Sequence, residues 1–191
     1  MYREKTLDGK RVHSGMLDDI MEPLFRRSPR EKLHSQNVFR ISGQIATSMN
    51  LSETAIRKIR DIGYYHDIGK IILDKNILNK ATELSHEEKE IMKKHTMIGY
   101  RILNLFNETM DIAEVVLAHH ERWDGQGYPK GLKGEEIPLY ARIISVAEVY
   151  DAMTNRVDGN NLSHEEAIEN IKSKAGSNYD PGVVKAFLEI Q

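Results

Sequence analysis

Two pairs of neighbouring ionisable residues stand out in this 191-residue sequence, His66-Asp67 and His119-His120. Each pair follows an apolar run with helical spacing. The sequence contains no cysteine, so a bound metal must be held by nitrogen and oxygen atoms. Imidazole and carboxylate side chains offer those atoms, and neighbouring ligands can serve two ions that lie close together. The two pairs therefore suggest a metal centre with more than one ion.

Further histidines occupy the apolar faces of other predicted helices. His34 is in phase with Val38 in a helix predicted from residue 29 to about 49, and His95 lies within the apolar stripe of a helix predicted from residue 86 to about 106. A single histidine in such a place is usually a hydrogen-bonded core residue. Burying many ionisable groups apart from one another is costly, so we expect the whole set to converge on cations. The set is His34, His66, Asp67, His95, His119, His120 and Glu148.

The late carboxylate of this set has two candidates. Glu148 and Asp151 are three residues apart in a helix predicted over residues 139–154, so they share one face with apolar residues. The sequence leaves open which of the two would bind a metal.

A pair of metal ions suggests hydrolysis of a phosphoester. Two-metal sites, with ions roughly 3.5–4 Å apart, activate one water molecule and neutralise the phosphoryl oxygens. Lys70, three residues after Asp67, can add positive charge at the same phosphate. Residues 123–138 are rich in glycine and proline, and a loop of this length is typical of a functional segment.

The remaining residues are predicted to form the helices that position this centre. Helix starts with the pattern of a capping box occur three times, and no segment alternates in the manner of a strand. The fold class is therefore predicted to be all-α. The three starts are Ser28-Pro29-Arg30-Glu31, Ser85-His86-Glu87-Glu88 and Ser163-His164-Glu165-Glu166.

The composition excludes several classes of function. The net charge is −2 with 29% charged residues, so there is no basic excess that would suggest binding of duplex nucleic acid. No apolar run approaches the ~20 residues of a membrane-spanning helix, and the polar start does not resemble a signal peptide. We therefore expect no direct membrane insertion and a cytoplasmic location.

The motifs resemble those of the HD-GYP family, within the HD phosphohydrolase superfamily. The resemblance rests on His66-Asp67-Ile68-Gly69-Lys70 and on the long motif from His119 to Pro129, His-His-Glu-Arg-Trp-Asp-Gly-Gln-Gly-Tyr-Pro, and it extends over about residues 28–188. It implies an HD-domain bundle of about seven or more helices with the metal centre in its core. It also implies a phosphodiesterase that opens cyclic di-GMP to linear pGpG, GMP or both.

The resemblance also implies roles for individual residues. Two divalent ions, iron or manganese, would be bound by the seven residues named above, with Asp67 bridging them. The nucleophile would be a metal-bound hydroxide, and Lys70 would steady the phosphate charge. Tyr128 and its loop would shape the substrate pocket, and Arg156 would contact the substrate.

Three positions depart from the family pattern. Glu148 stands where the family usually has aspartate. Arg30 stands four residues before His34, where members with three metals have glutamate, which favours two metals over three although Glu31 is adjacent. The loop after Arg156 lacks the second basic residue that the family usually has there, which puts the substrate in question.

The sequence also leads to expectations about domains, partners and alternatives. We expect a linker and lead-in helix over residues 1–27, followed by the HD-GYP domain over residues 28–191. Residues 1–5 resemble the end of a GGDEF domain, so the chain is expected to come from a longer protein with GGDEF or sensor domains. The apolar face of residues 16–25 would cover the core or form a homodimer, and we expect the former. The alternatives to the phosphodiesterase are a non-catalytic binding module and a hydrolase of another cyclic dinucleotide such as cyclic GMP-AMP.

Overall fold

The structure is a computed structural model that describes residues 14–155 and 159–191. These residues contain helices and no β-strand, which confirms the prediction of an all-α bundle with at least seven helices. None of the helices in these ranges is long and apolar enough to span a membrane. In chain order the elements are α1 Ser14–Arg27, α2 Pro29–Ser48, α3 Glu53–Tyr65, the 3-10 helix η1 Ile68–Ile72, α4 Lys75–Leu78, α5 His86–Leu103, α6 Met110–Ala118, the 3-10 helix η2 Gly134–Glu136, α7 Leu139–Thr154, α8 His164–Ser173 and α9 Pro181–Leu188.

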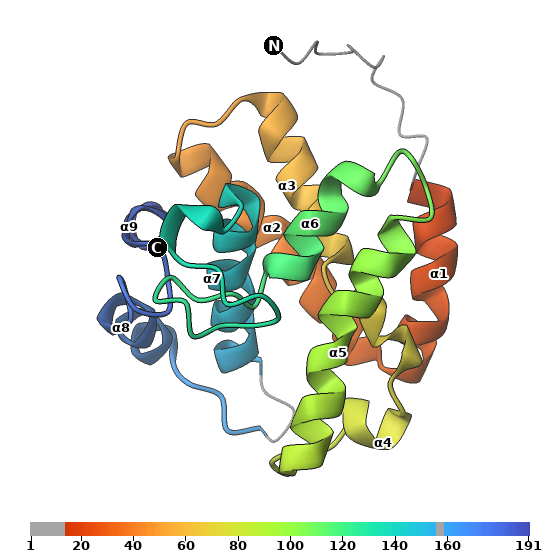
Figure 1. The fold of residues 1–191 in the computed structure, drawn as a ribbon. Helices are drawn as coiled ribbons and strands as arrows, with labels where there is room; N and C mark the ends of the chain where they lie inside the picture. The colour runs from red at the N-terminus through yellow and green to blue at the C-terminus, as the bar shows by residue number, and fades with distance from the viewer. Residues whose placement is uncertain (1–13, 156–158) are drawn as a thin grey trace.

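Helix α2 lies near the middle of the bundle and packs against both α3 and α7 (Figure 1). α1 and α5 lie on one side of it, with η1 packed against both, while α7, α8 and α9 lie on the other side. The apolar faces meet in one core, in which Val38, Ile45, Ile62, Val116 and Ile144 are fully buried. Because burial of a large aliphatic side chain contributes about 1.5–3 kcal/mol, this core holds together the helices that carry the predicted site residues.

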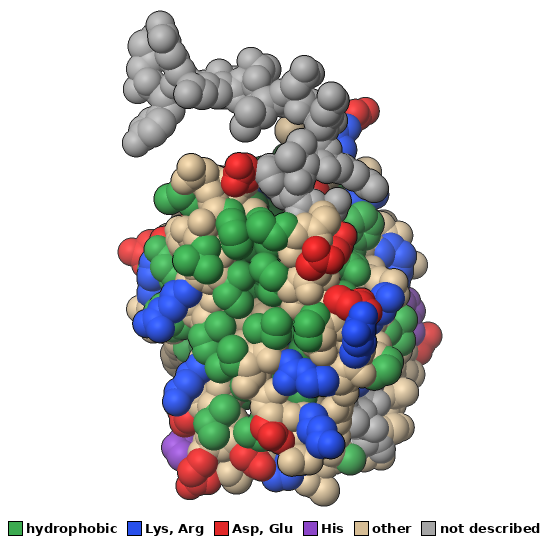
Figure 2. All heavy atoms as spheres, turned by 90° about the vertical axis from the view of Figure 1, so that its right-hand side faces the viewer, with side chains coloured by type: hydrophobic (Ala, Val, Ile, Leu, Met, Phe, Trp, Pro, Cys, Tyr) green, Lys and Arg blue, Asp and Glu red, His purple; other side chains and the backbone are tan. Residues whose placement is uncertain are grey.

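Helix α1 covers the core, as expected from its apolar face. Leu17, Met21 and Leu24 are buried. Figure 2 shows the side of the molecule where α1 and α5 lie, with apolar side chains gathered between charged ones. Met16 in α1 and Met97 in α5 each remain 37% exposed. The domain boundary at residue 27 and the homodimer stay predictions, and the resemblance of residues 1–5 to a GGDEF domain lies outside the described residues.

Two of the three predicted capping boxes are present, those that begin at Ser85 and Ser163. The third, at Ser28, is wrong. The backbone N–H of Ser28 already donates to the carbonyl of Leu24 at the end of α1, so it is not available to the Glu31 side chain. The Ser28 hydroxyl makes no cap hydrogen bond either, and Glu31 turns inwards instead.

Helix η1 approaches α5 so closely that only glycine fits at residue 69. A Cβ atom on Gly69 would lie 1.9 Å from the carbonyl oxygen of His95 and 2.6 Å from the backbone nitrogen of Gly99. Both are backbone atoms, which cannot turn aside as a flexible side chain would. The close approach places Asp67, at the start of η1, beside His95 in the middle of α5.

Candidate metal centre

Three histidine rings of the centre are held in the same way, by a carbonyl group one helical turn earlier. Nδ1 of His66 lies 2.8 Å from the carbonyl oxygen of Gly63, and Nδ1 of both His95 and His119 lies 2.6 Å from the carbonyl oxygen three residues earlier. Because a carbonyl oxygen can only accept, Nδ1 carries the hydrogen and Nε2 keeps a free electron pair. This arrangement is typical of histidines that bind metals through Nε2.

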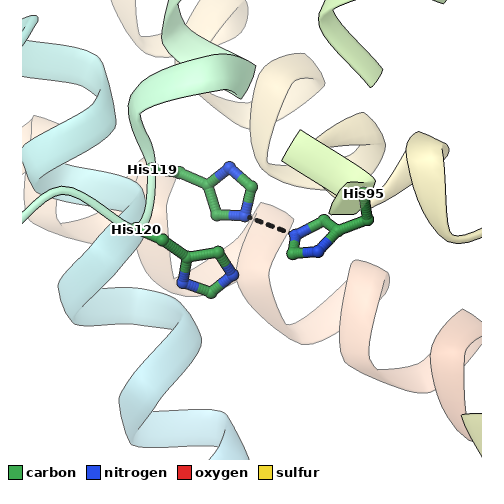
Figure 3. A group of neighbouring side chains, drawn as sticks. All are labelled: His95, His119 and His120. Carbon is green, nitrogen blue, oxygen red and sulfur yellow. Dashed lines mark hydrogen bonds between the residues drawn. The ribbon is translucent and has the colours of Figure 1, made fainter. Parts of the chain in front are cut away.

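The ligand atoms form three overlapping groups, and within each group they lie within 4.8 Å of one another. In the first group, the rings of His95, from α5, and of His119 and His120, at the end of α6, point towards one another (Figure 3). The Nε2 atoms of His95 and His119 are 3.2 Å apart. Two electron pairs at this distance repel unless a cation or a proton lies between them. The groups are His95, His119 and His120; His34, His66 and Glu148; and His66, Asp67 and His119.

Asp67 lies between two sets of histidines. Its Oδ1 is 3.3 Å from Nε2 of His95, while its Oδ2 is 3.2 Å from Nε2 of His66 and 3.7 Å from Nε2 of His34. The two carboxylate oxygens therefore face different histidines. This geometry suits a carboxylate that bridges two cations.

The donor atoms fit a divalent cation. Both carboxylate oxygens of Asp67 and Nε2 of His66 are buried without a hydrogen bond of normal geometry within the described part of the chain, and of the three Oδ2 of Asp67 has an ion pair with Lys70. Leaving such groups unsatisfied costs about 1–3 kcal/mol each, and more for a charged group. A cation among the three atoms removes this cost, so the buried histidine and aspartate clusters are suited to binding divalent metal.

The electrostatic environment favours the protonation states that ligands need. Burial would raise the pKa of Asp67, but the neighbouring His66 ring and the Lys70 ammonium hold it well below its usual value. Burial lowers the pKa of His119 and His120 well below the usual value. The carboxylate is therefore charged and the imidazoles are neutral, as metal binding requires.

Asp151 orients His34. Its Oδ2 lies 2.6 Å from Nδ1 of His34, and its Oδ1 accepts hydrogen bonds from Asn37 (2.7 Å) and Asn155 (2.8 Å). Both carboxylate oxygens thus have partners. Because the N–H at Nδ1 of His34 donates to Asp151, Nε2 of the same ring is directed towards Asp67.

Glu148 is the other candidate for the late carboxylate ligand, and it lies one turn earlier on α7. Its Oε1 lies 3.6 Å from Nε2 of His120, and it belongs to the group formed with His34 and His66. Burial raises the pKa of Glu148 to about 7. Of the two late carboxylates, Glu148 therefore has the geometry of a ligand, although its role stays a prediction.

Lys70 is held at the centre by two carboxylates. Its Nζ lies 2.7 Å from Oδ2 of Asp67 and 3.0 Å from Oε2 of Glu31. Burial would lower the pKa of Lys70, but these two anions raise it, so the ammonium stays charged. The sequence pattern predicted Glu31 as part of a helix cap and gave no prediction of this contact. The signal was its position three residues before His34, on the same face of α2.

Glu121 ties the glycine-rich loop to the centre. Its carboxylate accepts the backbone N–H groups of Lys130 (2.6 Å), Gly131 (3.1 Å) and Leu132 (3.1 Å). The sequence pattern did not predict this role. The only local sign was a glutamate directly after His120, and its burial is a feature of the structure.

Tyr128 lies against the centre, at the position where the loop returns to α6. Its backbone N–H donates to the carbonyl of His120 (3.2 Å), and its ring stacks on the His120 ring with centroids 4.9 Å apart and an interplanar angle of 26°. The structure thus brings together all the predicted site residues that it describes. Arg156 lies outside the described residues.

The sequence of this chain is similar to those of known proteins. The HD domain family model matches residues 14–183. A cyclic di-GMP phosphodiesterase of Thermotoga maritima is 46% identical over 161 residues, which cover 83% of this chain and 44% of the relative. A 3'3'-cGAMP-specific phosphodiesterase 2 of Vibrio cholerae is 34% identical over 186 residues, which cover 96% of this chain and 36% of that protein. The chain thus spans less than half the length of these relatives.

The fold is also found among solved structures. Bd1817, a HDG"Y"P protein from Bdellovibrio bacteriovorus, superposes with a TM-score of 0.68 at 18% identity, over 92% of this chain and 60% of that one. At this identity the likeness concerns the fold alone. Because the family model matches most of the chain and the Thermotoga maritima protein is 46% identical to it, this chain belongs to the HD-domain family and is homologous to the HD-GYP cyclic di-GMP phosphodiesterases.

Proposed function

We propose that this domain is a metal-dependent phosphodiesterase that hydrolyses cyclic di-GMP to linear pGpG, to GMP or to both. The observation that carries the proposal is the position of Asp67. Its two oxygens are buried without normal hydrogen bonds and face different histidines, with the Lys70 ammonium 2.7 Å away. Anionic and cationic groups converge here on one point, as hydrolysis of an anionic diester requires.

The proposed centre holds two divalent ions, iron or manganese. One would be held by His95, His119 and His120 and the other by His34, His66 and Glu148, with Asp67 shared between them. Such a pair supplies a water activated for attack and positive charge for the phosphoryl oxygens. Because Lys70 already neutralises Glu31, that carboxylate is not needed as a ligand, which favours two ions over three.

The side chains of the protein would position the substrate for this reaction. Lys70 would exchange part of its contact with Asp67 for a phosphate oxygen, and Glu31 would hold its ammonium in place. Tyr128 would form a wall of the pocket, since its ring already lies on His120, and Arg156 would contact the substrate. A water oxygen would bond to phosphorus in line with the leaving ribose oxygen, and the bond between phosphorus and that ribose oxygen would break. The water would give up one proton, and the leaving ribose oxygen would take one up.

A product assay tests the proposal. The protein is purified without oxygen, its metals are quantified, and it is incubated with cyclic di-GMP before the products are separated by chromatography. We expect linear dinucleotide or GMP in proportion to the metal content. The Asp67→Asn variant, which keeps the shape of the side chain but loses its charge, is expected to form none. A protein that holds about two ions per chain and forms no product would overturn the proposal.

A second cyclic dinucleotide is favoured by one observation. The relative named as specific for 3'3'-cGAMP aligns with 96% of this chain. Competition between the two substrates in the same assay would separate these activities, and binding of either without turnover would identify the binding-module alternative. GGDEF or sensor domains in a longer parent protein, a homodimer and a cytoplasmic location remain predictions from the sequence.

A further inference from the structure

Lys93 marks the outer edge of the centre. It belongs to α5, two residues before His95, and its Nζ lies 5.6 Å from the centroid of the Tyr128 ring. The ring of Tyr128 is in turn stacked on His120. A metal-ligating histidine, an aromatic ring and a lysine ammonium therefore follow one another from the centre to its edge. The Lys93 side chain is 44% exposed, so this row of side chains runs from the buried centre to solvent.

The ammonium of Lys93 is available to an anion. Its partner is Glu90 on the same helix, with Nζ and Oε1 2.5 Å apart, and the two side chains are 44% and 50% exposed. Ion pairs at this exposure contribute little to stability, because water screens them and both side chains lose freedom. A phosphate can therefore displace Glu90 at little cost. In contrast, Lys70 is already held by two buried partners.

Two lysines thus lie near Tyr128. Lys70 is buried beside Asp67 and acts against the rise in pKa that burial causes in Tyr128, while Lys93 is exposed and lies over the Tyr128 ring. A cyclic dinucleotide carries two phosphodiester groups, and only one of them can be at the metals at a time.

We propose that Lys93 is a substrate-binding residue that contacts the second phosphate of a cyclic dinucleotide while the first is at the metal centre. The proposal rests on the proposed phosphodiesterase function. It makes Lys93 a determinant of affinity and of the preference for substrates with two phosphates.

Steady-state kinetics of matched variants test the assignment. With cyclic di-GMP, Lys93→Ala is expected to raise KM about five- to ten-fold, as loss of a charge-assisted contact should, with kcat and metal content little changed. Lys93→Arg should restore most of the affinity. Lys94→Ala is the control, because this exposed lysine is the next residue and points about 100° away around the helix. Glu90→Gln should lower KM, since it frees Lys93.

A substrate with one phosphodiester separates direct binding from an indirect effect. Lys93→Ala should leave kcat/KM for bis(p-nitrophenyl) phosphate within about two-fold of the wild-type value, since this diester has no second phosphate to lose. An equal loss of kcat/KM with both substrates would mean that Lys93 acts through Tyr128 or the metals, and would overturn the assignment. An unchanged KM for cyclic di-GMP, or the same rise in Lys94→Ala, would overturn it too.

Failure of the proposed function would be recognised separately. If the wild-type domain does not turn over cyclic di-GMP, calorimetry with the same ligand decides. Weaker binding by Lys93→Ala than by Lys94→Ala would retain Lys93 as a binding residue and reject only the hydrolysis. Absence of binding by the wild-type protein would reject both.

Discussion

Replacing Gly69 by alanine should disrupt the proposed metal centre although no ligand side chain is changed. The added Cβ atom would lie 1.9 Å from the carbonyl oxygen of His95, whereas ordinary contacts begin at 3.4 Å. Helix η1 and α5 would therefore have to separate by about 1.5 Å. Asp67 lies just before η1 and His95 lies on α5, so the separation moves one side of the centre away from the other.

The size of the effect follows from this overlap. Overpacking usually costs about 1–3 kcal/mol, and here both nearest atoms are backbone, so we expect the upper end of that range or more. For a chain of this length a loss of about 3 kcal/mol corresponds to a fall in Tm of roughly 6–12 °C. Metal ligation tolerates only about 0.2 Å of displacement, so bound metal should also be lost.

The assay compares Gly69→Ala with Gly15→Ala. A Cβ atom on Gly15 would meet nothing within 4 Å, so this variant controls for the chemical change alone. Thermal unfolding of the metal-free proteins is followed by circular dichroism, and metal per chain is measured after reconstitution. If the Tm of Gly69→Ala lies within about 2 °C of the wild-type Tm and the variant binds the same amount of metal, then η1 and α5 do not pack closely enough to exclude a Cβ atom at residue 69.

Three further predictions concern the centre itself. His66→Ala should abolish turnover and lower bound metal while the helical circular dichroism persists, and near-full activity would show that the site is misassigned. Tyr128→Ala should raise KM about ten-fold and leave metal bound; loss of metal would mean that the ring supports His120. The metal-free protein should lose stability as pH falls below about 6.5. Burial lowers the pKa of the three histidines of Figure 3. Below about pH 6.5 these histidines are therefore protonated in the unfolded chain and remain neutral in the folded chain, which favours unfolding. Burial raises the pKa of Glu148 from 4.5 to about 7, which opposes the trend by one proton. The net slope is at most about 3 kcal/mol per pH unit between pH 4.5 and 6.5, and urea denaturation that shows flat or rising stability as pH falls would contradict it.

Helical periodicity was sufficient to predict the fold class and the inward direction of the candidate ligands. His95 lies within an apolar stripe, and a residue in phase with core residues must face the core once the helix forms. The two adjacent pairs were informative for a similar reason, because each stands at a helix end, where neighbouring side chains point in different directions. These features depend on local spacing, which the sequence displays directly.

Other features depend on partners that are distant in the sequence. Glu31 fits a capping box by local spacing, yet it binds Lys70, 39 residues away. Glu148 and Asp151 share a helix face, and periodicity cannot distinguish them. The distinction comes from Asn37, which satisfies Asp151 from another helix. Which partner each of these carboxylates binds is decided by tertiary packing, and the local sequence shows no pattern for it.

The distance in sequence between His34 and its partner Asp151 has a consequence for biosynthesis. The two residues are 117 positions apart, and the residues around the centre are carried by α2, η1, α5, α6 and α7. During translation the earlier helices leave the ribosome long before α7 does, so the cluster is incomplete until late in synthesis. Any ion taken up before then meets only part of the set and is held weakly. A chain could therefore bind its metal tightly only after it has been synthesised and folded at least as far as α7.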